Sequence, residues 1–166
     1  NEATGGSLQS LIDSKKAKTC AGTVTSWLQP QGIRAPVALI VGLGDDPSSG
    51  DCFQAGGAAA KSLAKSKLET VAFYFPKLDA ALLESAVAGS VVGSTGQDLH
   101  KKTPSLHTPG QILWATDNTD AVINGSKIGS GVNLTRELVN QPPNYIYPES
   151  FADQTAKLAE LENVTV

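Results

Sequence analysis

The sequence predicts a layered α/β fold with a partly parallel sheet. Short runs rich in β-branched and aromatic residues alternate along the chain with alanine-rich stretches of helical spacing, the pattern of an α/β protein. One of these runs, 37–43, is apolar throughout, which is typical of a strand buried on both faces. Apolar residues make up 40% of the 166 residues, enough for the core of one domain, alone or with a fragment of another.

Four segments are expected to be strands, because they are short and rich in β-branched and aromatic residues. They are 23–28, 37–43, 70–75 and 111–116. The first two are separated by Pro30, Gly32 and Pro36, which mark a turn suited to a hairpin.

Helical spacing of apolar residues predicts five helices. They are expected from Leu8 to about Lys16, over 53–68, over 78–92, over 124–143 and from Pro148 onward. In the second, Ala55 and Ala59 form a small-residue face that can approach the sheet closely. In the fourth, Gly125, Gly129 and Gly131 each cost about 1 kcal/mol relative to alanine. Because Gly125 and Gly129 lie one turn apart, we expect close packing against another element to compensate.

Charge and hydropathy argue against two classes of function. Lys and Arg total 13 against 16 Asp and Glu, a net charge of −3, and no basic stripe of the kind used to bind duplexes is present. The longest strongly apolar run, 37–41, is far shorter than the ~20 residues that a membrane helix needs. Neither nucleic acid nor a membrane is therefore expected as a partner.

The cysteine content indicates a reducing compartment. Cys20 and Cys52 allow at most one disulfide, and we interpret them as two free thiols. No charged and then apolar leader is visible around Asn1. A cytoplasmic location is expected.

The glycine-containing segment after the second strand is expected to be a structural turn. Gly42 and Gly44 follow a strand and precede a helix, which is the context of a dinucleotide-binding loop. That loop needs a third glycine three positions after Gly44, and Pro47 occupies the site.

No residue is assigned a catalytic, metal-binding or cofactor-binding role. His100 and His107 lie in a polar loop without the further close ligands that a zinc site needs. Neither cysteine has a nearby Cys or His in the sequence, and no serine lies in a nucleophile elbow.

The segment Asn118-Thr119-Asp120-Ala121 resembles part of the Asn-Thr-Asp-Ala-Glu-Gly segment with which one aminopeptidase family binds its metals. Here Val122 and Ile123 stand where glutamate and glycine would be, so the next carboxylate ligand is missing. Asp120 is instead expected to be the N-cap of a helix.

A longer resemblance comes from the C-terminal third. The stretch 131–144, GVNLTRELVNQPPN, continued by 147–152, YPESFA, resembles the linker of the leucyl (cytosol) aminopeptidase family, where a helix with an NLARDLVNxPPN pattern joins the N-terminal domain to the catalytic domain. Two further stretches agree with that family's N-terminal domain: 39–44 with the alanine-rich helix after it, and 88–93.

The resemblance implies an N-terminal α/β domain similar to macro domains, with three layers and a mixed, mostly parallel sheet flanked by helices. It implies the domain over 1–123, a linker helix over 124–143, and a truncated start of the catalytic domain over 144–166. The family's members are hexameric metallo-exopeptidases that remove N-terminal residues from peptides with two divalent metals, zinc or manganese. Metal ligands and catalytic residues belong to the catalytic domain, so none is carried over to this chain and no cofactor is expected in this piece.

The expected function is that of a non-catalytic domain in assembly or in access to the active site. Its partners would be its own C-terminal catalytic domain and further copies of the chain in a hexamer, with peptides as substrates of the whole enzyme. Two alternatives remain: a stand-alone macro-like module that binds a ligand of the ADP-ribose type, with 42–50 as its loop, and a purely structural oligomerisation domain.

Overall fold

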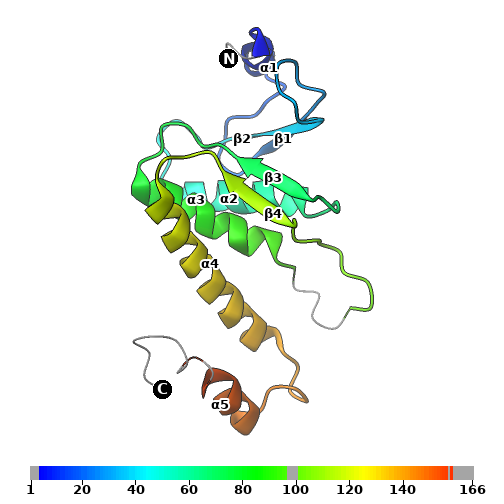
Figure 1. Ribbon diagram of the computed structural model, residues 1–166, viewed down its shortest axis with the longest axis vertical. Coiled ribbons are helices and arrows are strands. Elements are labelled where there is room, and N and C mark those ends of the chain that lie inside the picture. Colours follow the sequence, from blue (N-terminus) through cyan, green and yellow to red (C-terminus); the bar gives the residue numbers. More distant parts are fainter. Residues whose placement is uncertain (1–3, 97–100, 157, 159–166) are drawn as a thin grey trace.

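The computed structural model describes residues 4–96, 101–156 and 158 (Figure 1). In chain order the elements are α1 (Ser7–Asp13), β1 (Val24–Leu28), β2 (Val37–Val41), α2 (Ser49–Leu63), β3 (Thr70–Phe73), α3 (Ala80–Ser94), β4 (Gln111–Trp114), α4 (Thr119–Asn140) and α5 (Pro148–Ala156). The α/β fold class is therefore confirmed, and each expected strand and helix is present.

The strands form two pairs in the described part of the chain. β1 and β2 are antiparallel, with Val24 opposite Val41 and Leu28 opposite Val37, which confirms the expected hairpin. β3 and β4 are parallel, with Phe73 opposite Trp114. β3 and β4 are joined through α3, a connection long enough for parallel pairing, whereas the short link between β1 and β2 suits an antiparallel hairpin.

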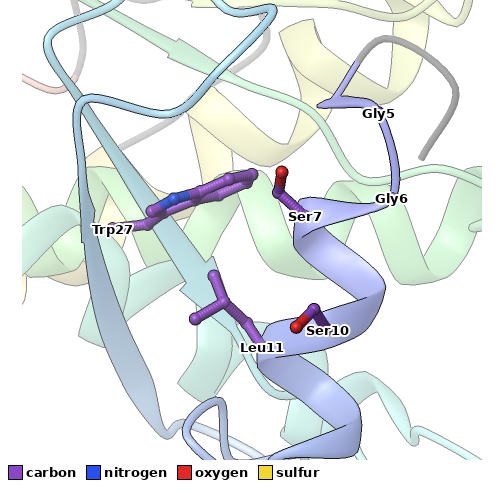
Figure 2. Close-up of a pocket in the computed structure, with 6 residues that line it drawn as sticks. All are labelled: Gly5, Gly6, Ser7, Ser10, Leu11 and Trp27. Carbon is purple, nitrogen blue, oxygen red and sulfur yellow. The ribbon is translucent and has the colours of Figure 1, made fainter.

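Helices lie on both faces of the β1–β2 hairpin, so this part of the fold has three layers (Figure 1). Val41 packs against Ala59 and Ala60 of α2. Trp27 lies three residues from Val24, the partner of Val41, and strand alternation therefore places it on the opposite face. On that face Trp27 meets α1, where Leu11 lies beside its indole ring (Figure 2).

The core beneath β3 and β4 is built on stacked aromatic rings. The ring centroids of Phe73 and Trp114 are 4.8 Å apart with an interplanar angle of 14°, and Phe75 stacks beside them. Ala59 and Ala60 of α2 pack against Phe73, which confirms that small residues let this helix approach the sheet. Trp114 also packs against a second cluster, which consists of Leu83, Val87 and Ala121.

Glycines set the distance between α2 and α3. A Cβ atom added at Gly56 would collide with the carbonyl of Ala86, and one at Gly89 would collide with the carbonyl of Phe53. Each helix thus presents a glycine to the backbone of the other. The two helices can reach this separation only without side chains at these points.

The same device joins α3 to α4. A Cβ at Gly129 would lie 2.7 Å from the Cβ of Val91, and one at Gly125 would lie 2.7 Å from the Cβ of Val87. Both glycines are buried, and the expected close packing is confirmed. Gly131 has no neighbour within 4 Å of the corresponding position.

The largest differences from the expected helix starts are at α2 and α4, and α4 begins at Thr119, five residues earlier than expected. α2 begins at Ser49, four residues earlier than expected, because Ser48 and Asp51 form a capping box. The expectation that Asp120 caps α4 is wrong: Asn118 is the N-cap, and its Oδ1 accepts a hydrogen bond of 3.1 Å from the Ala121 amide. Asp120 lies in the first turn, where a carboxylate favours the helix dipole without being the cap.

One substitution at two positions of α4 tests this packing. Gly125→Ala is expected to lower the free energy of unfolding by about 1–3 kcal/mol, because the added methyl group overpacks the contact with α3. Gly131→Ala is expected to raise it by up to about 1 kcal/mol through helix propensity alone. Urea unfolding followed by circular dichroism measures both, and stabilisation by both substitutions would contradict the packing account.

Candidate functional site

The turn after β2 is held together by its own backbone. The Gly42 amide donates to the Thr23 carbonyl over 2.9 Å, and the Gly44 amide donates to the Thr19 carbonyl over 2.8 Å. A Cβ at Gly42 would collide with the backbone at Thr19 and Cys20, and Gly44 has a φ of +84°. The glycines serve a close approach and a left-handed turn, which confirms the structural interpretation of this segment.

At the start of α2, the carboxylate of Asp51 accepts hydrogen bonds from Ser48. Both the amide and the hydroxyl of Ser48 donate to Asp51 Oδ2, over 2.9 and 2.6 Å, and the Asp51 amide donates to the Ser48 hydroxyl over 3.2 Å. The side-chain and backbone hydrogen bonds from Ser48 lower the pKa of Asp51. The amide and the hydroxyl of Ser48 are therefore both engaged by a carboxylate of the chain itself.

The residues considered as metal ligands are not brought together where the structure describes them. In the described ranges no three His, Cys, Asp or Glu residues form a group that could hold a metal ion. The backbone amide of His107 donates to the Ala64 carbonyl over 2.7 Å, which ties the long loop to the end of α2. His100 lies outside the described residues. Asp117 and Asp120 line a surface depression together with Asn118, whose oxygen already caps α4.

The two cysteines are free thiols, as expected. Cys20 is exposed and Cys52 is fully buried near the start of α2. Burial raises the pKa of the Cys52 thiol, and the charges of Asp51 and Asp79 raise it further. Cys52 therefore behaves as a small apolar residue of the core. Little of its thiol is in the thiolate form that could act as a nucleophile or bind a metal.

A small depression lies between α1 and the β1–β2 hairpin. Figure 2 shows Ser7 and Leu11 of α1 next to the indole of Trp27, with Gly5 and Gly6 at the rim. Leu11 of α1 and Trp27 of β1 both line it, so the depression lies where α1 packs on the hairpin. We assign this depression a packing role.

Many of the exposed large hydrophobic side chains lie on α4 and the segment after it. α4 turns Ala121, Gly125 and Gly129 inward to α3. Its other sides and the following residues expose large hydrophobic side chains, 77% exposed at Val139 and 56% at Tyr145; these are Ile123, Ile128, Leu134, Val139, Tyr145, Tyr147 and Phe151. We call this set the linker surface. Figure 1 shows the C-terminal half of α4 and α5 extending away from the rest of the fold.

Two polar residues of α4 bond to the last turn of α3. Asn133 Nδ2 donates to the Val91 carbonyl over 3.1 Å, and Arg136 Nη1 donates to the Val92 carbonyl over 3.1 Å. Both residues lie in the motif at 131–144, but the sequence alone indicated no role for either. Only the fold brings them to α3, 42 and 44 residues away in the chain.

Residues 1–103 match the family model described as the cytosol aminopeptidase family, N-terminal domain. The chain belongs to that family, and the resemblance seen in the sequence is confirmed.

Curated relatives extend the likeness over nearly the whole chain. It is 29% identical over 163 residues to a "Probable cytosol aminopeptidase" of Rhodopirellula baltica, covering 95% of this chain and 32% of that protein. A protein of the same name from Streptomyces avermitilis is 30% identical over 182 residues, covering 97% of this chain and 35% of that protein. The chain thus spans about a third of the length of these relatives.

Solved structures support the fold. The bottromycin maturation enzyme BotP superposes with a TM-score of 0.75 at 23% identity, covering 90% of this chain and 34% of that enzyme. A structure of BotP in complex with Mn gives a TM-score of 0.74. Within the described residues, no helix is both long enough and apolar enough to span a bilayer.

The capping box provides a prediction about charge. Ser48→Ala removes the hydroxyl that donates to Asp51, so the pKa of Asp51 is expected to rise toward the ordinary value of an aspartate. Because the folded-state pKa of Asp51 is lowered, its ionised form stabilises the fold above the unfolded-state pKa, and this stabilisation is lost as the pH falls through the folded-state pKa. Carboxyl NMR titration of both proteins measures the shift. An unchanged Asp51 pKa in the variant would contradict the assignment.

Proposed function

We propose that this chain is the non-catalytic N-terminal domain of a metal-dependent leucyl aminopeptidase, which removes N-terminal amino acids from peptides. In this proposal the domain holds its own C-terminal catalytic domain in place and takes part in assembly or in access to the active site. The whole enzyme would be a cytoplasmic hexamer. Family membership and the length of the relatives support this placement.

The observation that carries the proposal is the two-sided character of α4. One side is fixed to α3 through Gly125 and Gly129. The linker surface is exposed and ends in the aromatic residues Tyr145, Tyr147 and Phe151. Exposed apolar side chains of this size are typical of a surface that another structure covers. A catalytic domain that follows the linker helix in the same polypeptide would cover it.

The proposal places the two divalent metals, zinc or manganese, in the catalytic domain. The described residues of this chain do not fit such a centre: the carboxylate of Asp51 is engaged by Ser48, the oxygen of Asn118 caps α4, and the thiol of Cys52 is buried. Two metals in the catalytic domain would polarise the scissile carbonyl and activate the attacking water. This domain would supply position and not chemistry.

The direct test is turnover of leucine anilide. The 166-residue chain is expected to show none with added Zn²⁺ or Mn²⁺, whereas the native polypeptide purified from its source is expected to show turnover that a chelator abolishes. With a nitroanilide as the substrate, the absorbance of the released nitroaniline measures both. Metal-dependent turnover by the 166-residue chain alone would overturn the assignment of a non-catalytic role.

A further inference from the structure

The C-terminal end of α3 is completed by side chains from other segments. The last four carbonyls of a helix have no partner within it. The Val91 carbonyl accepts from the hydroxyls of Ser94 and Thr95 over 3.0 and 3.1 Å, and from Asn133 Nδ2 of α4 over 3.1 Å. The Val92 carbonyl accepts from Arg136 of α4 over 3.1 Å.

Asn133 and Arg136 act as a pair. Arg136 Nη1 also donates to Asn133 Oδ1 over 2.8 Å, which directs the amide nitrogen of Asn133 toward α3. That nitrogen donates further to Thr95 Oγ1 over 3.1 Å. The guanidinium lies at the negative end of the α3 dipole, and a charged donor makes the stronger kind of hydrogen bond. We call these two residues the α3–α4 clasp.

The α3–α4 clasp lies just after the last glycine of α4 that contacts α3. Gly129 is the last glycine of α4 in contact with α3, since Gly131 faces open space. Beyond it, the contacts of Asn133 and Arg136 hold the C-terminal half of α4, which then continues to Asn140 away from the α2–α3 layer (Figure 1). These two residues supply hydrogen bonds that join the later turns of α4 to the end of α3.

We propose that the α3–α4 clasp is a positioning device that sets the angle of the linker helix on the domain. Through their hydrogen bonds to the Val91 and Val92 carbonyls, Asn133 and Arg136 make the end of α3 the second anchor of α4, the first being the glycine contact. The consequence for placing a catalytic domain rests on the proposed function, but the angle of α4 is a property of this chain alone.

Spin labels on the two helices test the proposal. In the full 166-residue chain with Cys20→Ser, labels are attached at Lys61→Cys on α2 and Val139→Cys on α4, two exposed positions, while Cys52 stays buried. The parent is expected to give a narrow distance distribution by pulsed electron paramagnetic resonance. Asn133→Ala combined with Arg136→Met is expected to broaden it and to speed amide exchange in residues 134–140 about tenfold or more, with α2 and α3 unchanged.

Two control variants show whether the effect comes from the hydrogen bonds of the clasp or from the loss of a positive charge alone. Lys127→Met removes a cation from an exposed position of the same helix and is expected to leave the distribution narrow. Asn133→Asp keeps the acceptor for Arg136 but loses the donor to Val91, and is expected to broaden the distribution partly.

An unchanged distribution in the double variant would overturn the proposal. Loss of the far-UV circular dichroism spectrum in both the double variant and Arg136→Met alone would show a global role in folding and would also overturn it. Neither readout depends on peptidase activity, so failure of the proposed function would leave this result intact.

Discussion

The backbones of three helices meet at glycines, and the position of every other element depends on this contact. α3 is central: Gly56 of α2 meets it on one side, and Gly125 and Gly129 of α4 meet it on the other. Because α2 lies this close to α3, its alanines support Phe73 while Leu83 and Val87 of α3 reach the region of Trp114. A methyl group at these contacts would separate the layers that form the core.

The same contact gives α4 its role. A helix with several glycines does not hold itself by propensity, so its stability comes from the surface against which it packs. On α4 that surface is supplied first by Val87 and Val91 and then by the carbonyls that Asn133 and Arg136 reach. Ile123, Ile128, Leu134 and Val139 of α4 remain exposed. Under the proposed function, this arrangement would let α4 position a catalytic domain.

Local sequence patterns were sufficient to predict the elements, and contacts distant in sequence were not. Strand composition and alternation gave all four strands, and the one-turn spacing of Gly125 and Gly129 gave the close packing of α4. Asp120 was wrongly chosen as the cap because Asn118, Thr119 and Asp120 are all of residue types that can cap a helix, and only the geometry shows that Asn118 accepts from the Ala121 amide. The clasp could not be predicted, since Asn133 and Arg136 acquire partners only when α3 is placed beside them. That no residue of the chain has a catalytic or metal-binding role stays a prediction.

The mass of the native polypeptide in its source cells tests the central claim most directly. An immunoblot raised against this domain is expected to detect a product much larger than 17.2 kDa, about three times as long if it resembles the curated relatives. Such a product would carry the structure that covers the linker surface. A native product of 17.2 kDa would contradict the claim that α4 joins this domain to a catalytic one, and the family relationship would then describe ancestry and not activity.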